Sequence, residues 1–195
     1  LANLDEKLRE ELRDQLPELF KGRGAVVVYA TSEPEEALLL GGKTALMQDG
    51  KVAQFGPTAD IYRAPNSLMS AGIFSDPPIN MAEITKQGST ASMGKDIRWE
   101  LSGKQADLAD GLYKLAVRPH HVLPFETEEA NVPIVGKVLV TELSGSESSA
   151  HFAADMANWV SLARGIHRYQ VGENHQFFMD PNQCFVFALD GTLVG

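Results

Sequence analysis

The side chains of this 195-residue chain that most readily bind metals or act as nucleophiles are five histidines and one cysteine. Two of the histidines, His120 and His121, are adjacent, and on a strand neighbouring side chains point to opposite faces. Such a pair is poorly placed to chelate one ion. The other three show no spacing typical of a zinc site; they are His151, His167 and His175. We therefore predict no metal site.

Cys184 lies in an apolar run, which predicts a small buried hydrophobic residue rather than a reactive thiol. An acidic cluster at residues 126–129 is typical of a solvated loop, and no partner carboxylate points to acid–base catalysis. Trp99 and Trp159 lie in strand-like runs. We expect them to pack in the core; a surface that stacks on sugar rings is the alternative.

The loop that cradles the phosphates of a nucleotide needs the pattern G-x-x-x-x-G-K-[ST], and the sequence contains no such pattern. The run Gly41-Gly42-Lys43-Thr44 ends in G-K-T, but the earlier glycine is missing. It also follows a predicted helix rather than a strand. We expect this chain neither to bind nucleotide tightly nor to hydrolyse ATP by itself.

The bulk composition excludes several classes of protein. Hydrophobic residues make up 44% of the chain, as in a globular protein, and the formal net charge is −9. An acidic chain is a poor match for nucleic acid or for an anionic membrane surface. The single cysteine precludes an internal disulfide. Because the first residue is Leu1 rather than methionine, we expect the chain to begin inside a longer protein.

In the first part of the chain, helices are predicted to alternate with extended segments. Leucines at every fourth position predict an amphipathic helix over residues 3–20. The apolar run at 25–30 predicts a strand buried in a parallel sheet. Ser32 and Pro34 suit the start of a helix that Gly41 ends. The sequence Asp49-Gly50 predicts a hairpin, followed by short helices at about 57–63 and, capped by Asn66, up to Gly72.

The best domain boundary is at Ser75-Asp76-Pro77-Pro78, since two prolines fit neither a helix interior nor a central strand. We therefore predict domains at residues 1–77 and 78–195. Short strand-like runs in the second domain indicate a small all-β sandwich or barrel, with a hairpin tip or loop at 86–95. They cover residues 81–85, 97–101, 112–117, 134–143, 149–153, 159–163, 176–179 and 184–189.

The first part supplies too few strands to cover both edges of the strand at 25–30. It has the pattern of the tail of a larger α/β sheet. We expect it to expose apolar surface and to self-associate, while the barrel folds on its own.

Segments in this order resemble parts of the ATPase subunits of ABC transporters. The resemblance is strongest to the MalK-like subfamily that energises uptake of carbohydrates, polyols or glycerol phosphates. The segments are the D-loop at 1–9 (LANLDEKLR), the switch strand and next helix at 27–37 (VVYATSEPEEA), the hairpin at 46–56 (LMQDGKVAQFG), the run 61–65 (IYRAP) and the exit into an appended domain at 74–81 (FSDPPINM). Residues 113–119 (YKLAVRP) and 138–146 (VLVTELSGS) resemble that domain, an OB-like barrel called TOBE.

The resemblance implies a fold in which the tail of a RecA-like α/β ATPase domain precedes the barrel. It implies that Asp5 is the D-loop aspartate, which lies across the interface of an ATPase dimer. It places Ser32 where the family has a switch histidine that contacts the γ-phosphate. A serine hydroxyl is shorter and cannot become cationic near neutral pH. Either another group contacts the γ-phosphate, or a partner subunit carries out hydrolysis. The alternative interpretation is that Ser32 only caps a helix.

The resemblance also implies ATP and Mg²⁺ in the intact parent, although the family's signature and Walker B runs are absent from this sequence. LSGKQ at residues 101–105 is a near match to the signature, in the wrong place. The implied partners are a second ATPase subunit, identical or not, and membrane permease subunits. The implied location is the cytoplasmic face of the bacterial inner membrane. Two other roles stay open for the barrel: binding a small solute, oxyanion or regulatory protein, or holding two subunits together.

Overall fold

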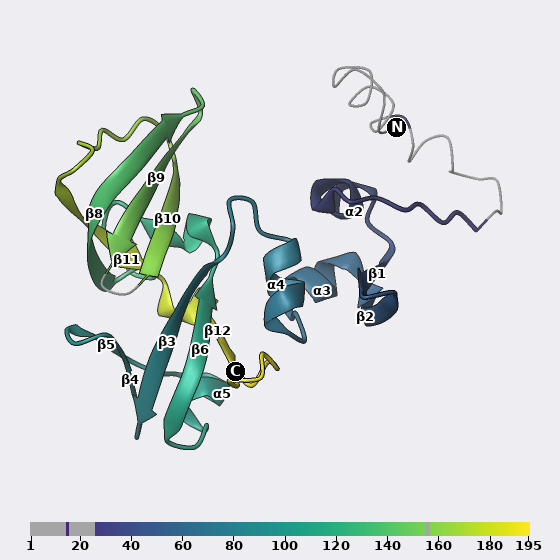
Figure 1. Ribbon diagram of the computed structural model, residues 1–195, viewed down its shortest axis with the longest axis horizontal. Coiled ribbons are helices and arrows are strands. Elements are labelled where there is room, and N and C mark those ends of the chain that lie inside the picture. Colours follow the sequence, from purple (N-terminus) through teal and green to yellow (C-terminus); the bar gives the residue numbers. More distant parts are fainter. Residues whose placement is uncertain (1–14, 16–25, 155–156) are drawn as a thin grey trace. The chain divides into compact units, whose positions relative to one another are not determined.

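The computed structural model describes residue 15 and residues 26–154 and 157–195 (Figure 1). The chain divides into two compact units, Leu1–Ala64 and Pro65–Gly195. The helix expected over residues 3–20 lies outside the described residues except at Gln15, which is helical. No described helix is both long enough and apolar enough to cross a membrane.

The described part of the first unit consists of two helices and a hairpin. Helix α2 (Pro34–Leu40) begins with proline at its first position and ends at Gly41, whose positive φ of 64° suits glycine. Strands β1 (Lys43–Gln48) and β2 (Lys51–Pro57) pair antiparallel across Asp49 and Gly50, both with positive φ, as the sequence predicts. Helix α3 (Thr58–Arg63) follows as expected.

The expected strand at 25–30 does not form over its described part, residues 26–30. A strand of a parallel sheet takes its hydrogen bonds from neighbouring strands, and no described strand pairs with these residues. Val26 and Val28 are 94% and 91% exposed. Together with the half-exposed hairpin side chains Met47 and Phe55 they give the first unit the apolar surface that its sequence predicts.

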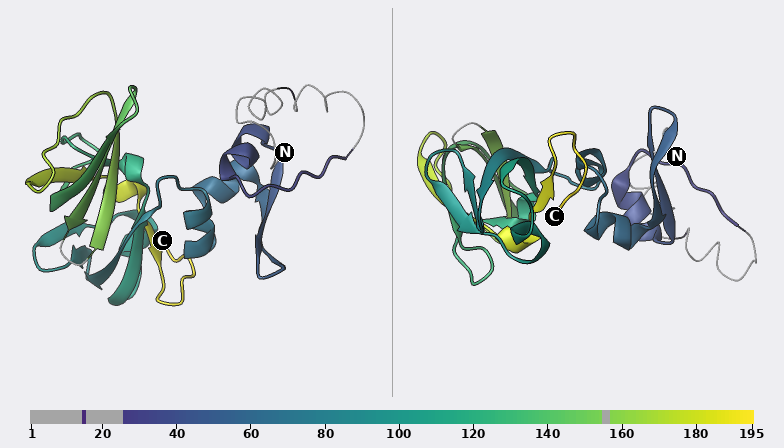
Figure 2. Two further views of the ribbon diagram at one scale, coloured as in Figure 1. Left: turned by 45° about the horizontal axis from the view of Figure 1, so that its top comes forward. Right: turned by 90° about the horizontal axis from the view of Figure 1, so that it is seen from below.

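The second unit contains two five-stranded antiparallel sheets (Figures 1 and 2). One has the order β12-β6-β3-β4-β5 and the other the order β10-β9-β8-β11-β7. Strand β10 contacts β3 and strand β5 contacts β8, so the sheets meet along both sides and share one core, as in a partly closed barrel. The strands of the first sheet are β3 (Asn80–Gln87), β4 (Thr90–Met93), β5 (Ile97–Glu100), β6 (Gly111–Val117) and β12 (Phe185–Phe187). Those of the second are β7 (Val122–Leu123), β8 (Val132–Leu143), β9 (Glu147–Ala154), β10 (Ala157–Arg164) and β11 (Asn174–Met179).

The all-β prediction for the second part of the chain is thus confirmed, with two strands added. The segment 86–95 is a hairpin as predicted, but its tip is only Gly88 and Ser89, and β4 follows at once. Strand β7 has two residues, too few for a sequence pattern. Three single-turn helices join the strands: α5 (Gly103–Ala106), η1 (Pro119–His121) and η2 (Pro181–Gln183).

The shared core is built from alternate residues of the strands, which point inward. An aromatic stack stands at its centre: the rings of Phe152 and Phe177 lie 4.0 Å apart and nearly parallel. Gly136 makes this stack possible, because a β-carbon there would lie 2.3 Å from the Phe152 ring.

Helix α4 (Leu68–Ile73) packs on the outer face of the first sheet, where Ala71 lies with Ala116 and Phe187 in a second apolar cluster. This packing explains why the compact unit begins at Pro65, before the sequence boundary at 77/78. As a boundary between domains, 77/78 stays a prediction. The cap of α4 is Ser67, not Asn66, since the Ser67 hydroxyl accepts from the Ser70 amide at 3.2 Å.

Candidate functional site

Ser32, which the resemblance predicts to stand at the switch-histidine position, lies exposed in the bend before α2. The Glu33 amide donates to the Thr31 hydroxyl at 2.9 Å, which closes a local turn around it. On the other side of the bend, the Tyr29 hydroxyl donates to the buried Glu36 carboxylate at 3.0 Å. The Ser32 side chain therefore stands in solvent on a short segment that is held at both ends.

The expectation that Ser32 caps α2 is wrong. The N-cap is Glu33, in extended conformation, and its side chain makes no capping hydrogen bond. Pro34 fixes its own φ and has no amide hydrogen, so the first turn contains one N–H fewer that needs an acceptor. Capping thus does not account for a serine at this position. Asp5, the other predicted site residue, lies outside the described residues.

Gly41 and Gly42 form hydrogen bonds that hold the local structure. The Gly41 amide donates back to the Ala37 carbonyl at 3.1 Å, and the Gly42 carbonyl accepts from the Thr58 amide at 3.1 Å. The Thr58 hydroxyl contacts the Thr44 hydroxyl at 2.8 Å. These bonds join the end of α2 to the start of α3. The Gly41 amide and the Gly42 carbonyl are therefore engaged in hydrogen bonds within the first unit.

His120 and His121 lie in the turn η1, not on a strand as the sequence analysis assumed. Pro119 starts this turn and brings the two rings to 4.2 Å. Burial, with the charges of His120 and Arg118, lowers the pKa of His121 to about 4. Burial, with the Arg118 charge, also lowers the pKa of His120. The His121 ring is therefore neutral at pH 7.

Within the described ranges, no three His, Cys, Asp or Glu side chains gather closely enough to hold a metal ion. Cys184 is a buried free cysteine just before β12, and its Sγ donates to the Asp180 carbonyl at 3.3 Å. Burial raises the pKa of its thiol far above the usual value. The acidic side chains predicted to lie in a solvated loop are exposed, as expected; they are Glu126, Glu128 and Glu129.

Both tryptophans pack in the core, as predicted, and neither offers a stacking surface. Trp99 is 7% exposed and Trp159 is 1% exposed. The Trp159 indole nitrogen donates to the Met81 carbonyl at 3.1 Å, which ties β10 to β3. Their aromatic area stabilises the barrel rather than a ligand.

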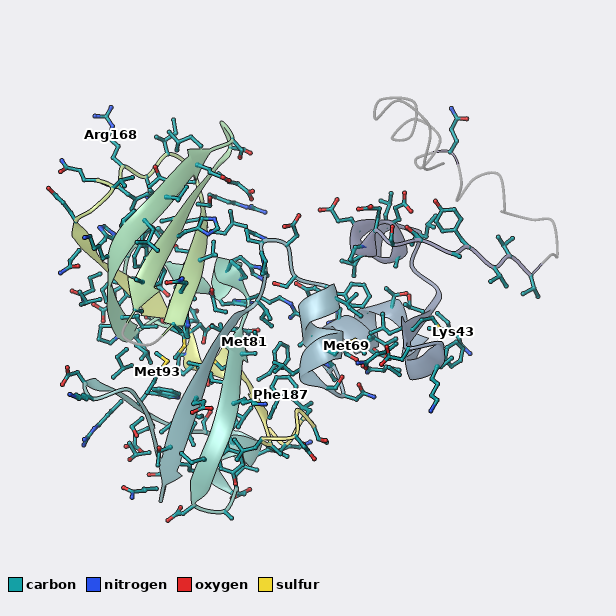
Figure 3. The ribbon with its side chains drawn as sticks, viewed as in Figure 1. Lys43, Met69, Met81, Met93, Arg168 and Phe187 are labelled. Atoms are coloured by element: carbon teal, nitrogen blue, oxygen red, sulfur yellow. The ribbon has the colours of Figure 1, made fainter. Side chains whose placement is uncertain are left out.

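A groove of about 730 Å³ opens beside β3, a volume ordinary for a small-molecule or peptide site. It exists because β4 pairs with β3 only at residues 85–87 and then diverges. Its walls combine apolar side chains with a carboxylate, an ammonium and two hydroxyls. They include Met81, Glu83, Thr85, Ser92, Met93, Ile97, Leu112, Lys114, Ala154 and Ala157 (Met81 and Met93 are labelled in Figure 3).

No sequence pattern predicted this groove, since the residues that line it were expected only to form strands or the loops between them. Alternation along β3 places Met81, Glu83 and Thr85 on one face, but an alternating strand carries no sign that its neighbour departs. The divergence of β4 is a tertiary feature.

Comparison with known proteins finds relatives among the ATP-binding proteins of sugar importers. It is 33% identical to the xylose/arabinose import ATP-binding protein XacK of Haloferax volcanii over 77% of this chain and 40% of that protein. It is 29% identical to the maltose/maltodextrin import ATP-binding protein MalK of Escherichia coli, over 98% of this chain and 54% of that protein. The Salmonella typhimurium protein of the same name is 28% identical with the same coverage. The chain spans about half the length of these relatives or less.

No family model matches the sequence. Among solved structures, the cytoplasmic molybdate-binding protein ModG, with molybdate bound, gives a TM-score of 0.41 and 14% identity over 56% of this chain and 95% of that one. Over most of its length the chain is thus similar to the ATP-binding subunits of sugar ABC importers, and its coverage of about half of those proteins or less is consistent with a C-terminal fragment of such a subunit.

Proposed function

We propose that the full-length protein is the ATP-hydrolysing subunit of an importer for a carbohydrate, polyol or glycerol-phosphate-like solute. It would lie at the cytoplasmic face of the bacterial inner membrane, bound to permease subunits and to a second ATPase subunit. The observation that carries this proposal is the match to maltose import subunits over 98% of this chain. In that assembly ATP and Mg²⁺ would act in the intact dimer.

The described residues would supply the switch segment and the barrel, and residues 1–9 would supply the D-loop with Asp5. We propose that this chain alone does not hydrolyse ATP, since its one G-K-T run is bonded to Thr58 instead of forming a phosphate loop. Calorimetric titration of the chain with Mg-ATP should give no heat of binding at micromolar concentrations. Micromolar affinity would contradict this part of the proposal.

Ser32 is the residue whose role most affects activity. A serine in solvent at the switch position can donate a hydrogen bond to phosphate or water, but it cannot supply a cationic ring. We infer that the subunit's own site is weak and that a partner with a complete site sets the rate, as in a heterodimer.

A chimera tests both the family role and that of Ser32. The matching part of the maltose import subunit of Escherichia coli is replaced by this chain, and ATPase activity and maltose uptake are measured. We expect low activity with Ser32, and activity at least about tenfold higher with Ser32→His, the size expected for a positioned catalytic group. Ser32→Ala is the matched control and should resemble Ser32. A folded chimera that is inactive even with Ser32→His would overturn the family role, and equal rates for all three would overturn the role of Ser32.

The groove beside β3 favours a second candidate function, in which the barrel is a binding module for a small solute or oxyanion. A thermal-shift screen with sugars, polyols and oxyanions tests it. A dose-dependent rise in melting temperature would support binding. If no compound has an effect and the barrel associates only with itself, the role of holding two subunits together is the better account.

A further inference from the structure

Strand β3 has one edge that is only partly paired. On one side it pairs with β6 from Asn80 to Lys86. On the other side β4 pairs with it only at residues 85–87. Strand β10 approaches the start of this second edge without forming a ladder with it, and the Asn80 and Trp159 side chains make the contacts. Among the described strands, none pairs with residues 82–84 along this edge.

The main-chain groups of Glu83 point into this gap. In an antiparallel strand, alternate residues direct both N–H and C=O to the same edge. The Met81 carbonyl accepts from Trp159 at 3.1 Å, and the Thr85 carbonyl accepts from the Ser92 hydroxyl at 3.3 Å, so residues 81 and 85 face this edge. Glu83, midway between them, must face it too.

The groove described above adjoins this edge. Its inner wall is apolar, with Ile84, Met93 and Ala154. Its outer face carries Glu83, which is exposed, opposite Lys114 on β6. The Lys114 ammonium donates to the Leu189 carbonyl at 2.6 Å, so this face carries one charge of each sign, with the Lys114 ammonium directed to a main-chain carbonyl and the Glu83 carboxylate exposed. The edge therefore offers a main-chain donor and acceptor, an apolar wall and a negative charge.

We propose that the open edge of β3 at Glu83 is a docking site for an extended peptide segment of a partner protein, which adds to the sheet as a short strand. The residue opposite Glu83 exchanges two main-chain hydrogen bonds with it and points its side chain to the same outer face. A basic side chain there meets the Glu83 carboxylate. The residues before and after it point inward, into the apolar wall.

The recognised chemistry is thus an apolar–basic–apolar segment in extended conformation. A net charge of −9 adds long-range attraction for such a basic segment. All of these contacts lie within the second unit, so the docking site does not depend on the importer assignment.

The probe is the capped peptide Thr-Val-Lys-Val-Thr, added to the full ¹⁵N-labelled chain. Main-chain pairing should slow hydrogen exchange of the Glu83 amide by about tenfold or more at saturation, since exchange follows local opening. The control is the same peptide with its lysine amide nitrogen methylated, which removes the hydrogen bond to Glu83 while keeping every side chain. This control should leave the Glu83 amide unchanged.

Two variants separate the main-chain and charge contributions. Glu83→Pro removes the edge-facing amide hydrogen together with the carboxylate, and should abolish binding; Glu83→Lys, which changes the charge alone, shows how much of that loss is due to charge. Glu83→Lys keeps the backbone. This variant should no longer bind the lysine peptide and should instead bind the matching peptide Thr-Val-Glu-Val-Thr. This charge exchange tests the site even if the proline variant fails to fold.

Three results would overturn the proposal. One is an unchanged exchange rate of the Glu83 amide at about 1 mM peptide, which would mean a binding free energy no more favourable than about −4 kcal/mol. Another is protection of that amide that rises with protein concentration without peptide, which would make the occupant a second copy of the chain. The last is equal binding of the lysine peptide by wild type and Glu83→Lys.

Discussion

The Asn80 side chain forms two hydrogen bonds with the main chain of Val160, as a neighbouring strand would. Its Nδ2 donates to the Val160 carbonyl at 2.8 Å, and its Oδ1 accepts from the Val160 amide at 2.6 Å. Both residues are buried. Together with the Trp159 indole, this side chain joins β3 to β10, between which the described residues form no ladder.

Replacing Asn80 should therefore destabilise the barrel strongly. Asn80→Leu leaves a buried amide and a buried carbonyl without partners, at a cost of about 2–4 kcal/mol for the two. Urea denaturation measures the free energy of unfolding. Asn131→Leu is the control: Asn131 is exposed, bonds only the Glu128 carbonyl, and should change stability by less than about 0.5 kcal/mol. Equal losses in the two variants would refute the bridging role.

Gly136 should not tolerate a β-carbon. Alanine there would lie 2.3 Å from the Phe152 ring and 2.8 Å from the Ala153 carbonyl oxygen, so Gly136→Ala should cost about 1–3 kcal/mol through overpacking. Gly111→Ala has its nearest neighbour at 3.9 Å and should be neutral. Thermal unfolding compares the two. If the ring is the obstacle, Phe152→Leu combined with Gly136→Ala should lose less stability than the sum of the single variants.

His121 should make stability depend on pH. Its pKa falls from an unfolded value of 6.5 to about 4 in the folded chain, chiefly through burial. The unfolded chain therefore binds the proton first as pH falls, and the stability present above pH 6.5 is lost progressively between pH 6.5 and 4. Since the ring is partly exposed, we expect a loss of roughly 1 kcal/mol. Melting temperatures of His121→Gln should fall less over this range; parallel curves for variant and wild type would contradict the prediction.

Cys184 should react only when the chain unfolds. Its thiol is buried, its pKa is raised by burial, and its Sγ is bonded to the Asp180 carbonyl. Because the thiolate is the reactive form, alkylation by iodoacetamide at pH 8 should be on the order of 100-fold slower in buffer than in urea. Mass spectrometry over time measures both rates. Comparable rates in the two solvents would show that the folded chain exposes this thiol.

The first unit should mediate self-association. Phe55 is 64% exposed and Met47 is 57% exposed on the hairpin, and Val28 is nearly fully exposed before α2. Exposed apolar surface of this kind promotes association. Sedimentation equilibrium should show a mass that rises with concentration, and Phe55→Ser with Met47→Ser should weaken the association. A monodisperse monomer of the unmodified chain would refute this expectation.

Much of the local structure followed from residues whose backbone preferences act over a few positions. Pro34 starts α2, Gly41 ends it, and Asp49-Gly50 turns the hairpin, because each residue's own φ range or missing hydrogen decides its place. The alternation of apolar and polar side chains likewise marked most strands of the barrel. At Ser32 the same reasoning failed, since the next residue became the cap.

Tertiary contacts decided the rest. Residues 26–30 have the composition of a buried strand, but hydrogen bonds from neighbours make a strand, and here no described strand pairs with them. The pKa values of His120 and His121 are lowered chiefly by burial, which η1 gains where it packs against β10. By itself the sequence determined the likeness to importer ATPase subunits and the order of most elements. The fold alone decided the closure through Asn80 and the open edge at Glu83, because both depend on where strands far apart in the chain come together.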